Sequence, residues 1–172
     1  MEPQDQIVNR VATSSLITFD LENYFEPGER VLIDLKEHLF QGMILREKDL
    51  RDFIKDHNWQ QYENKSVAIT CSADAIIPTW AFMLVAIAVN SYAKRVILGT
   101  LEQLEEKIFR EKLSEIDWLA YQNTKVVIKG CSKISVPESI YVEVVNKLKP
   151  IASSIMFGEP CSTVPLYKRP KS

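Results

Sequence analysis

Short apolar runs alternate along the chain with stretches whose apolar positions recur at helical spacing. The runs, rich in β-branched residues, predict strands at 30–35, 42–45, 66–70, 95–98, 125–129 and 154–157. Helical spacing predicts helices at 47–55, 78–90, 100–113 and 137–148. Two of these helices begin with a proline, which suits the first helical turn. Residues 1–29 look irregular, and 164–172 looks like a short basic tail.

Strands that alternate with helices are typical of a mostly parallel sheet with helical crossovers. We therefore expect an α/β fold in a single domain that covers 1–172. Within it we expect an N-terminal strand and helix segment at 1–56, two similar units at 59–99 and 118–158, and a C-terminal tail at 159–172.

A repeat with a period of 59 residues relates the two units. Shifting the chain by that period aligns seven identities in the same order: Trp59/Trp118, Tyr62/Tyr121, Val67/Val126, Ile69/Ile128, Pro78/Pro137, Ala93/Ala152 and Gly99/Gly158. The pattern indicates an internally duplicated strand-helix-strand unit. The alternative is that two unrelated units share turn and packing requirements by chance.

The three cysteines occur in similar sequence contexts. The segments CSADAIIP (71–78), CSKISVP (131–137) and CSTVP (161–165) each begin with Cys-Ser and end with Ile or Val before Pro. Cys71 and Cys131 follow the first strand of their units, and Cys161 follows the last strand of the second unit. If these strands are parallel, we expect all three thiols to lie at the carboxyl edge of one sheet, where ligands of open α/β sheets bind.

A thiolate at such an edge is stabilised by the unpaired N–H groups of a following helix. Three thiolates on one edge repel each other unless a cation neutralises them, which favours a zinc ion or an iron–sulfur cluster. The predicted ligands are Cys71, Cys131 and Cys161.

Each serine that follows a cysteine would cap a helix or donate a hydrogen bond to a sulfur atom. These residues are Ser72, Ser132 and Ser162. Three thiolates leave a fourth position open, and candidates for it are His38, His57, Asp74, Glu159, water or a partner molecule. A homodimer could also complete the site. Asp20 and Asp74 are otherwise expected to be turn or cap acids.

Two other functions stay open. The chain could be a thiol enzyme, sulfur carrier or redox protein in which one cysteine is the nucleophile and the others resolve it. It could instead be a protein-binding scaffold whose cysteines are small buried apolar residues. Whether the protein is an enzyme is left undecided by the sequence.

Composition narrows the class of protein. Of 172 residues, 46% are apolar and 26% charged, so a core can form and general disorder is excluded. Basic residues (21) nearly balance acidic ones (23), which argues against a nucleic-acid-binding protein. No apolar run approaches the roughly 18 residues of a membrane span, and the N-terminus lacks the pattern of a signal peptide, so we expect a cytoplasmic protein.

The segments CSADAIIPTWAF, VVIKGCSK, FGEPCSTVPLYKR and ERVLIDLKEHLFQGMIL resemble a bacterial family known as domain of unknown function 2480. The resemblance covers nearly the whole chain and shows no departure at the three Cys-Ser turns. Genes of this family often neighbour those for iron–sulfur cluster assembly and sulfur mobilisation. The resemblance therefore implies iron–sulfur assembly proteins as partners, and agrees with cluster chemistry at the cysteines.

Overall fold

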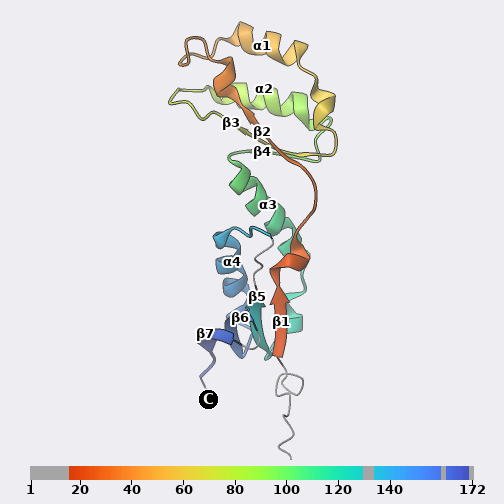
Figure 1. The fold of residues 1–172 in the computed structure, drawn as a ribbon, viewed down its shortest axis with the longest axis vertical. Helices are drawn as coiled ribbons and strands as arrows, with labels where there is room; N and C mark the ends of the chain where they lie inside the picture. The colour runs from red at the N-terminus through yellow and green to blue at the C-terminus, as the bar shows by residue number, and fades with distance from the viewer. Residues whose placement is uncertain (1–15, 130–133, 160–161, 171–172) are drawn as a thin grey trace, which may run out of the picture. The chain divides into compact units, whose positions relative to one another are not determined.

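A computed structural model describes residues 16–129, 134–159 and 162–170 (Figure 1). The chain forms two compact units, each with its own sheet and hydrophobic core. Unit 2 is Glu26–Ile108, and unit 1 consists of the chain before it and the chain from Phe109 onward. The sequence predicted one domain. Of the two predicted repeats, 59–99 lies in unit 2 and 118–158 lies in unit 1.

Unit 2 is built on a three-stranded parallel sheet in the order β2-β3-β4. Its elements are β2 (Arg30–Asp34), the 3-10 helix η2 (Leu35–His38), α1 (Glu47–Asp56), η3 (Trp59–Tyr62), β3 (Ser66–Thr70), α2 (Thr79–Asn90), β4 (Arg95–Leu98) and the start of α3 (Leu101–Ser114). The central strand β3 is buried along its length except at Thr70. Val67 and Ile69 of this strand pack with Val85 and Val89 of α2 in the core.

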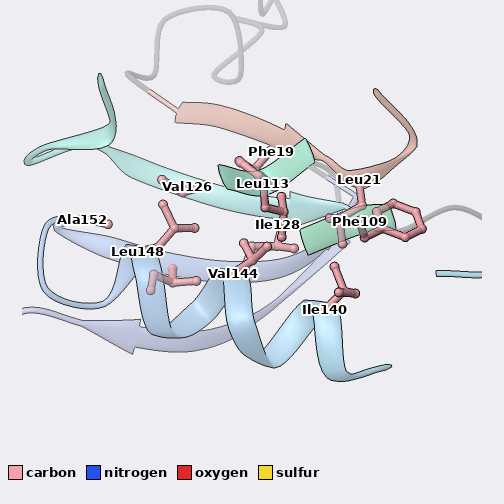
Figure 2. Packing of buried hydrophobic residues seen from close by; sticks show 11 residues of the cluster. Phe19, Leu21, Phe109, Leu113, Val126, Ile128, Ile140, Val144, Leu148 and Ala152 are labelled. Carbon is pink, nitrogen blue, oxygen red and sulfur yellow. The ribbon is translucent and has the colours of Figure 1, made fainter. Parts of the chain in front are cut away.

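Unit 1 contains a four-stranded sheet in the order β1-β5-β6-β7, parallel except for the last pair. Its elements are β1 (Leu16–Asp20), η1 (Leu21–Tyr24), the end of α3, η4 (Trp118–Tyr121), β5 (Lys125–Lys129), α4 (Glu138–Leu148), β6 (Ser154–Glu159) and β7 (Ser162–Lys168). Figure 2 shows Val144 and Leu148 of α4 lying against Val126 and Ile128 of β5.

The two units repeat one another in their packing as well as in their sequence. Fully buried core positions coincide at the shift of 59: Leu50/Phe109, Val67/Val126, Ala81/Ile140, Val85/Val144 and Val89/Leu148. The turn after each Trp-x-x-Tyr helix uses an asparagine at φ 60°, Asn64 and Asn123, a conformation that asparagine tolerates better than most residues. Their amides donate to the equivalent carbonyls of Tyr92 and Ile151. The internal duplication is therefore a property of the fold.

The duplication also includes a strand and a 3-10 helix that the sequence analysis did not relate. β1 with η1 and β2 with η2 match at a shift of 14 residues. Asp20 and Asp34 each end a strand and accept a hydrogen bond from the amide two residues later, and Leu21 and Leu35 after them are fully buried. Asp20 is thus a cap acid, as predicted.

Most predicted elements are confirmed within one or two residues, but the structure differs from the predictions in three segments. The segment 42–45 is not a strand: it forms a single bridge, Phe40 to Ile44, because Gln41 and Gly42 turn the chain at positive φ. Residues 1–29 are not all irregular, because they include β1, which pairs with β5 more than 100 residues later. The segment predicted as a C-terminal tail contains β7, an edge strand that pairs antiparallel with β6.

The core of unit 1 generates a stability prediction. Leu148→Ala removes a fully buried side chain and should lower the free energy of unfolding by about 2–5 kcal/mol, because it leaves a cavity under the sheet. Leu119→Ala makes the same change in the same unit, at a side chain that is 67% exposed. It should change the free energy of unfolding by less than about 0.5 kcal/mol. Urea denaturation measures both values, and equal losses would contradict the packing described for α4.

Candidate functional site

The cysteine-bearing strands belong to two different sheets. Cys71 directly follows β3 in the sheet of unit 2. Lys129 and Glu159, two residues before Cys131 and Cys161, end β5 and β6 in the sheet of unit 1. The expectation that all three strands share one sheet is wrong, because the duplicated units each close a separate sheet. Cys131, Ser132 and Cys161 themselves lie outside the described residues.

In unit 2, the first Cys-Ser turn is attached to the end of the neighbouring strand β2. Cys71 is a free, half-buried thiol that packs against the core of unit 2. Ser72 donates two hydrogen bonds to the Asp34 carboxylate: its amide to Oδ1 at 2.9 Å and its hydroxyl to Oδ2 at 2.6 Å. Because a serine hydroxyl has one proton, this arrangement directs it to Asp34. The role of Ser72 as a donor to sulfur stays a prediction.

Asp34 is therefore a charged centre at the carboxyl edge of the unit 2 sheet. Burial raises the pKa of its carboxyl group, but hydrogen bonds from the Ser72 hydroxyl, the Ser72 amide and the Lys36 amide outweigh burial, so the pKa is lowered. The sequence analysis missed this residue. The signal that could have found it is the Asp-Leu pair at 34–35, which repeats the pair at 20–21.

In unit 1, the equivalent edge carries a lysine between two carboxylates. Lys129 Nζ lies 3.7 Å from Asp20 Oδ2 and 3.5 Å from Glu159 Oε1. The negative charge of Glu159, and then that of Asp20, raises the pKa of Lys129, which keeps the ammonium group charged. Glu159 also pairs in register with Ser162, across the two residues that separate β6 from β7. The ends of β1, β5 and β6 thus meet around one positive charge.

A groove of about 660 Å³ lies beside this edge, between α4 and the strands of unit 1. Its walls are mostly apolar: Ile128, Val136, Glu138, Tyr141, Val142, Val145, Phe157 and Leu166. The Tyr141 ring meets the Phe157 ring edge to face, with centroids 5.7 Å apart. Burial, and then the negative charge of Asp20, raise the pKa of Tyr141, so its hydroxyl stays protonated.

Two of the predicted fourth ligands, His38 and His57, contact the same Phe53 ring. His38 stacks on Phe53 at 3.7 Å between ring centroids, and His57 Nε2 lies 2.9 Å from the Tyr62 hydroxyl, both in unit 2. Asp74 is exposed, and Glu159 contacts Lys129. Among the described residues, no group of three or more His, Cys, Asp or Glu side chains is arranged to hold a metal ion.

Comparison with known proteins identifies the family. A family described as Protein of unknown function (DUF2480) matches residues 5–169. The chain belongs to this family. The resemblance seen in the Cys-Ser segments is thereby confirmed. No curated protein and no solved structure matches the DUF2480 chain. Within the described ranges, the helices are too short or too polar to cross a membrane.

The contact between Ser72 and Asp34 generates a second prediction. Ser72→Ala removes the hydroxyl donor, so the pKa of Asp34 should rise and the free energy of unfolding at pH 7 should fall by about 1 kcal/mol, a modest amount because Ser72 is exposed. A lowered carboxyl pKa stabilises the fold above the unfolded-state value near 3.8, and this stabilisation is lost as the pH falls. The difference in the free energy of unfolding between Ser72→Ala and the wild type should therefore become smaller at acid pH.

Carboxyl NMR titration of Asp34, with denaturation at several pH values, measures both effects. Ser162→Ala makes the same substitution at another Cys-Ser turn, in unit 1, and should leave the pKa of Asp34 unchanged. A Ser72→Ala variant in which Asp34 titrates as in the wild type would contradict the described hydrogen bond.

The two histidines generate a third prediction. Burial lowers the pKa of both His38 and His57, and for His38 the charge of His57 adds to the effect. The unfolded chain therefore binds protons more readily than the folded one, so the free energy of unfolding should fall as the pH drops below about 6.5. Urea denaturation at several pH values between pH 8 and about pH 5 measures this change in the free energy of unfolding.

The matched variants are His38→Gln and His57→Gln. Each should flatten the pH dependence, even if it also lowers stability at pH 8, because the readout is the slope. A wild-type chain equally stable at both ends of the range would show that the histidines are not protected from protonation.

Proposed function

We propose that this DUF2480 protein binds a soft metal ion or an iron–sulfur cluster through Cys131 and Cys161 at the carboxyl edge of unit 1. It would act as an accessory protein of iron–sulfur or metal homeostasis. The observation that supports this function best is the meeting of β5 and β6 at Lys129 and Glu159, whose side chains lie 3.5 Å apart. Each of these residues stands two positions before a cysteine.

Chain length limits how far the two thiols can separate. Neighbouring strands lie about 4.8 Å apart, and two residues span at most about 7 Å. Glu159 and Ser162, on either side of residues 160–161, are paired in register, which would limit the reach of Cys161 further. Two cysteines attached so closely to adjacent strand ends are within reach of one metal centre, whose metal–sulfur bonds measure about 2.3 Å.

At this edge two carboxylates outnumber the one lysine, so a thiolate there would need a bound cation to neutralise the negative charge, which favours metal binding. The Lys129 ammonium group stays protonated and partly offsets the carboxylates of Asp20 and Glu159. A nearby cation lowers the pKa of a thiol and favours the thiolate, the form that ligates metals. At the shift of 59, Cys131 is the counterpart of Ser72, which contacts Asp34. We therefore propose that Cys131 lies near Asp20, the counterpart of Asp34.

The carboxylates could complete the ligand set. Zinc accepts carboxylate oxygen beside thiolate sulfur, so Glu159 and Asp20 are the proposed further ligands. Cys71 follows a strand of the other sheet, and its participation as a third thiolate stays a prediction. Ser132 and Ser162 are the proposed donors to sulfur. A reducing compartment such as the cytoplasm would keep the thiols free to bind.

The same lysine favours a second candidate function. A low-pKa thiolate beside Lys129 could act without metal, as a sulfur carrier or redox cysteine. The two functions differ in how the thiols react with an alkylating agent. A carrier has one thiol that reacts quickly at neutral pH, whereas a metal site protects its thiols until a chelator removes the metal.

Metal analysis of the full-length chain tests the proposal. The chain is purified without oxygen after iron-replete expression, and iron, zinc and acid-labile sulfide are measured per chain. We expect bound metal in the wild type and its loss in both Cys131→Ala and Cys161→Ala, because each variant removes one thiolate. If Cys71→Ala also loses its bound metal, Cys71 is a ligand. If Cys71→Ala retains the metal, the ligands are restricted to unit 1.

Circular dichroism shows that each variant is folded before its metal content is interpreted. A metal-free wild type, or metal content unchanged in Cys131→Ala and Cys161→Ala, would overturn the proposed site. One fast-alkylating thiol in a metal-free chain would favour the carrier, and three slow thiols would favour a scaffold with structural cysteines.

A further inference from the structure

The helix α2 presents an apolar stripe to solvent in unit 2. Trp80, Met83 and Ile87 are 37%, 59% and 70% exposed, and Leu84 beside them is half-buried. These four residues follow the spacing of one helical face, which we call the α2 face. The fully buried residues Ala81, Val85 and Val89 cover the sheet from the opposite side of the same helix. Leu84 also packs against the core, but Trp80, Met83 and Ile87 are not part of the core cluster of unit 2.

The helix contains no charged residue over its whole length, TWAFMLVAIAVN. A helix that is apolar all round is normally buried on every side. Ile76, four residues before Trp80, is 93% exposed and adds to the apolar surface of this region. Single exposed apolar residues are common, but a contiguous apolar patch marks an interaction site.

The duplicated helix α4 shows that the fold does not require these apolar residues. The positions that match the α2 face are occupied in α4 by Ser139, Val142, Glu143 and Asn146. Glu143 Oε2 accepts a hydrogen bond from Arg110 Nε at 2.9 Å. Arg51, the counterpart of Arg110, instead donates to Glu47 Oε1 at 2.8 Å, because position 84 carries leucine. Three of the four positions are thus polar in α4, whereas all four are apolar in α2.

The shape of this surface is that of a ridge between two grooves. One groove of about 390 Å³ runs between α1 and α2 and is lined by Glu47, Arg51 and all four residues of the α2 face. The other, about 290 Å³, lies between α2 and the sheet, where Ile87 and Leu98 are among its lining residues. Ile87 borders both grooves. A helix ridge of this kind packs into the groove beside another helix.

We propose that the α2 face is the interface with a second copy of this chain, in a two-fold symmetric dimer with antiparallel α2 helices. A two-fold interface requires a self-complementary surface. Here the ridge formed by the α2 face adjoins a groove, so the ridge of each copy can pack into the groove of the other. Antiparallel pairing places the Trp80 end of one helix against the Ile87 end of the other.

Electrostatics also favours a second copy as the occupant. The α2 face carries no charge, and the charged residues at its rim, Glu47 and Arg51, pair with each other. Two identical copies therefore approach without like-charge repulsion at the patch. The dimer is independent of the proposed metal site, because it uses α2 of unit 2 and neither Cys131 nor Cys161.

Sedimentation equilibrium of the full chain in the presence of a reductant tests the dimer. We expect a mass of twice 19.8 kDa at about 100 μM, dissociating on dilution. Ile87→Asn and Trp80→Ser each introduce the residue that α4 carries at the matching position, and each should raise the dissociation constant at least about tenfold. Met83→Glu should do the same, because it buries a charge at the centre of the interface.

Val142→Glu is the matched control, since Val142 occupies the position in α4 that Met83 occupies in α2 and is 61% exposed. This variant should dimerise like the wild type. Circular dichroism establishes that the variants fold, and Ile87→Asn and Trp80→Ser serve as two separate tests should either be unstable. A monomeric wild type at about 100 μM, undiminished dimerisation of the folded α2 variants, or equal dissociation of Val142→Glu would each overturn the proposal.

Discussion

Each unit of this protein depends on covering the central strand of a small parallel sheet. Parallel strands are stable only when both faces are protected from water, so β3 and β5 must be buried by the elements around them. The long crossover between parallel strands supplies the cover, since α2 and α4 place valine, isoleucine or leucine side chains on the strands that precede them. The matching buried positions of the two units follow from this shared requirement.

The same topology determines where chemistry can occur. Parallel neighbours end at a common edge, so the ends of β5 and β6 are adjacent, and so are the ends of β2 and β3. In unit 2, the edge joins Asp34 to Ser72 through two hydrogen bonds. In unit 1, the edge gathers Asp20, Lys129 and Glu159. Strand pairing thus brings a cap acid to a Cys-Ser turn in unit 2, and brings the cap acid Asp20 to the lysine that ends β5 in unit 1.

The two units also serve as an internal comparison, because one architecture carries two sets of surface residues. Leucine at position 84 and glutamate at 143 occupy equivalent places, and only the glutamate can pair with the arginine of the neighbouring helix. Both histidines lie in unit 2, where unit 1 has Tyr24 and Ile116 at the corresponding positions. The buried positions that the units share follow from folding, whereas the apolar α2 face is confined to unit 2 and is not required by the fold.

The sequence by itself determined the local elements and their duplication. β3, β5, α2 and α4 could be predicted because β-branched runs, helical periodicity and an initial proline act over a few neighbouring residues. Only the tertiary structure decided that β1 and β7 are strands and that the strands divide into two sheets. β1 pairs with a strand more than a hundred residues later, and β7 continues an edge despite Pro165. Such pairings depend on hydrogen-bonding partners distant in sequence, which no local pattern of apolar residues encodes.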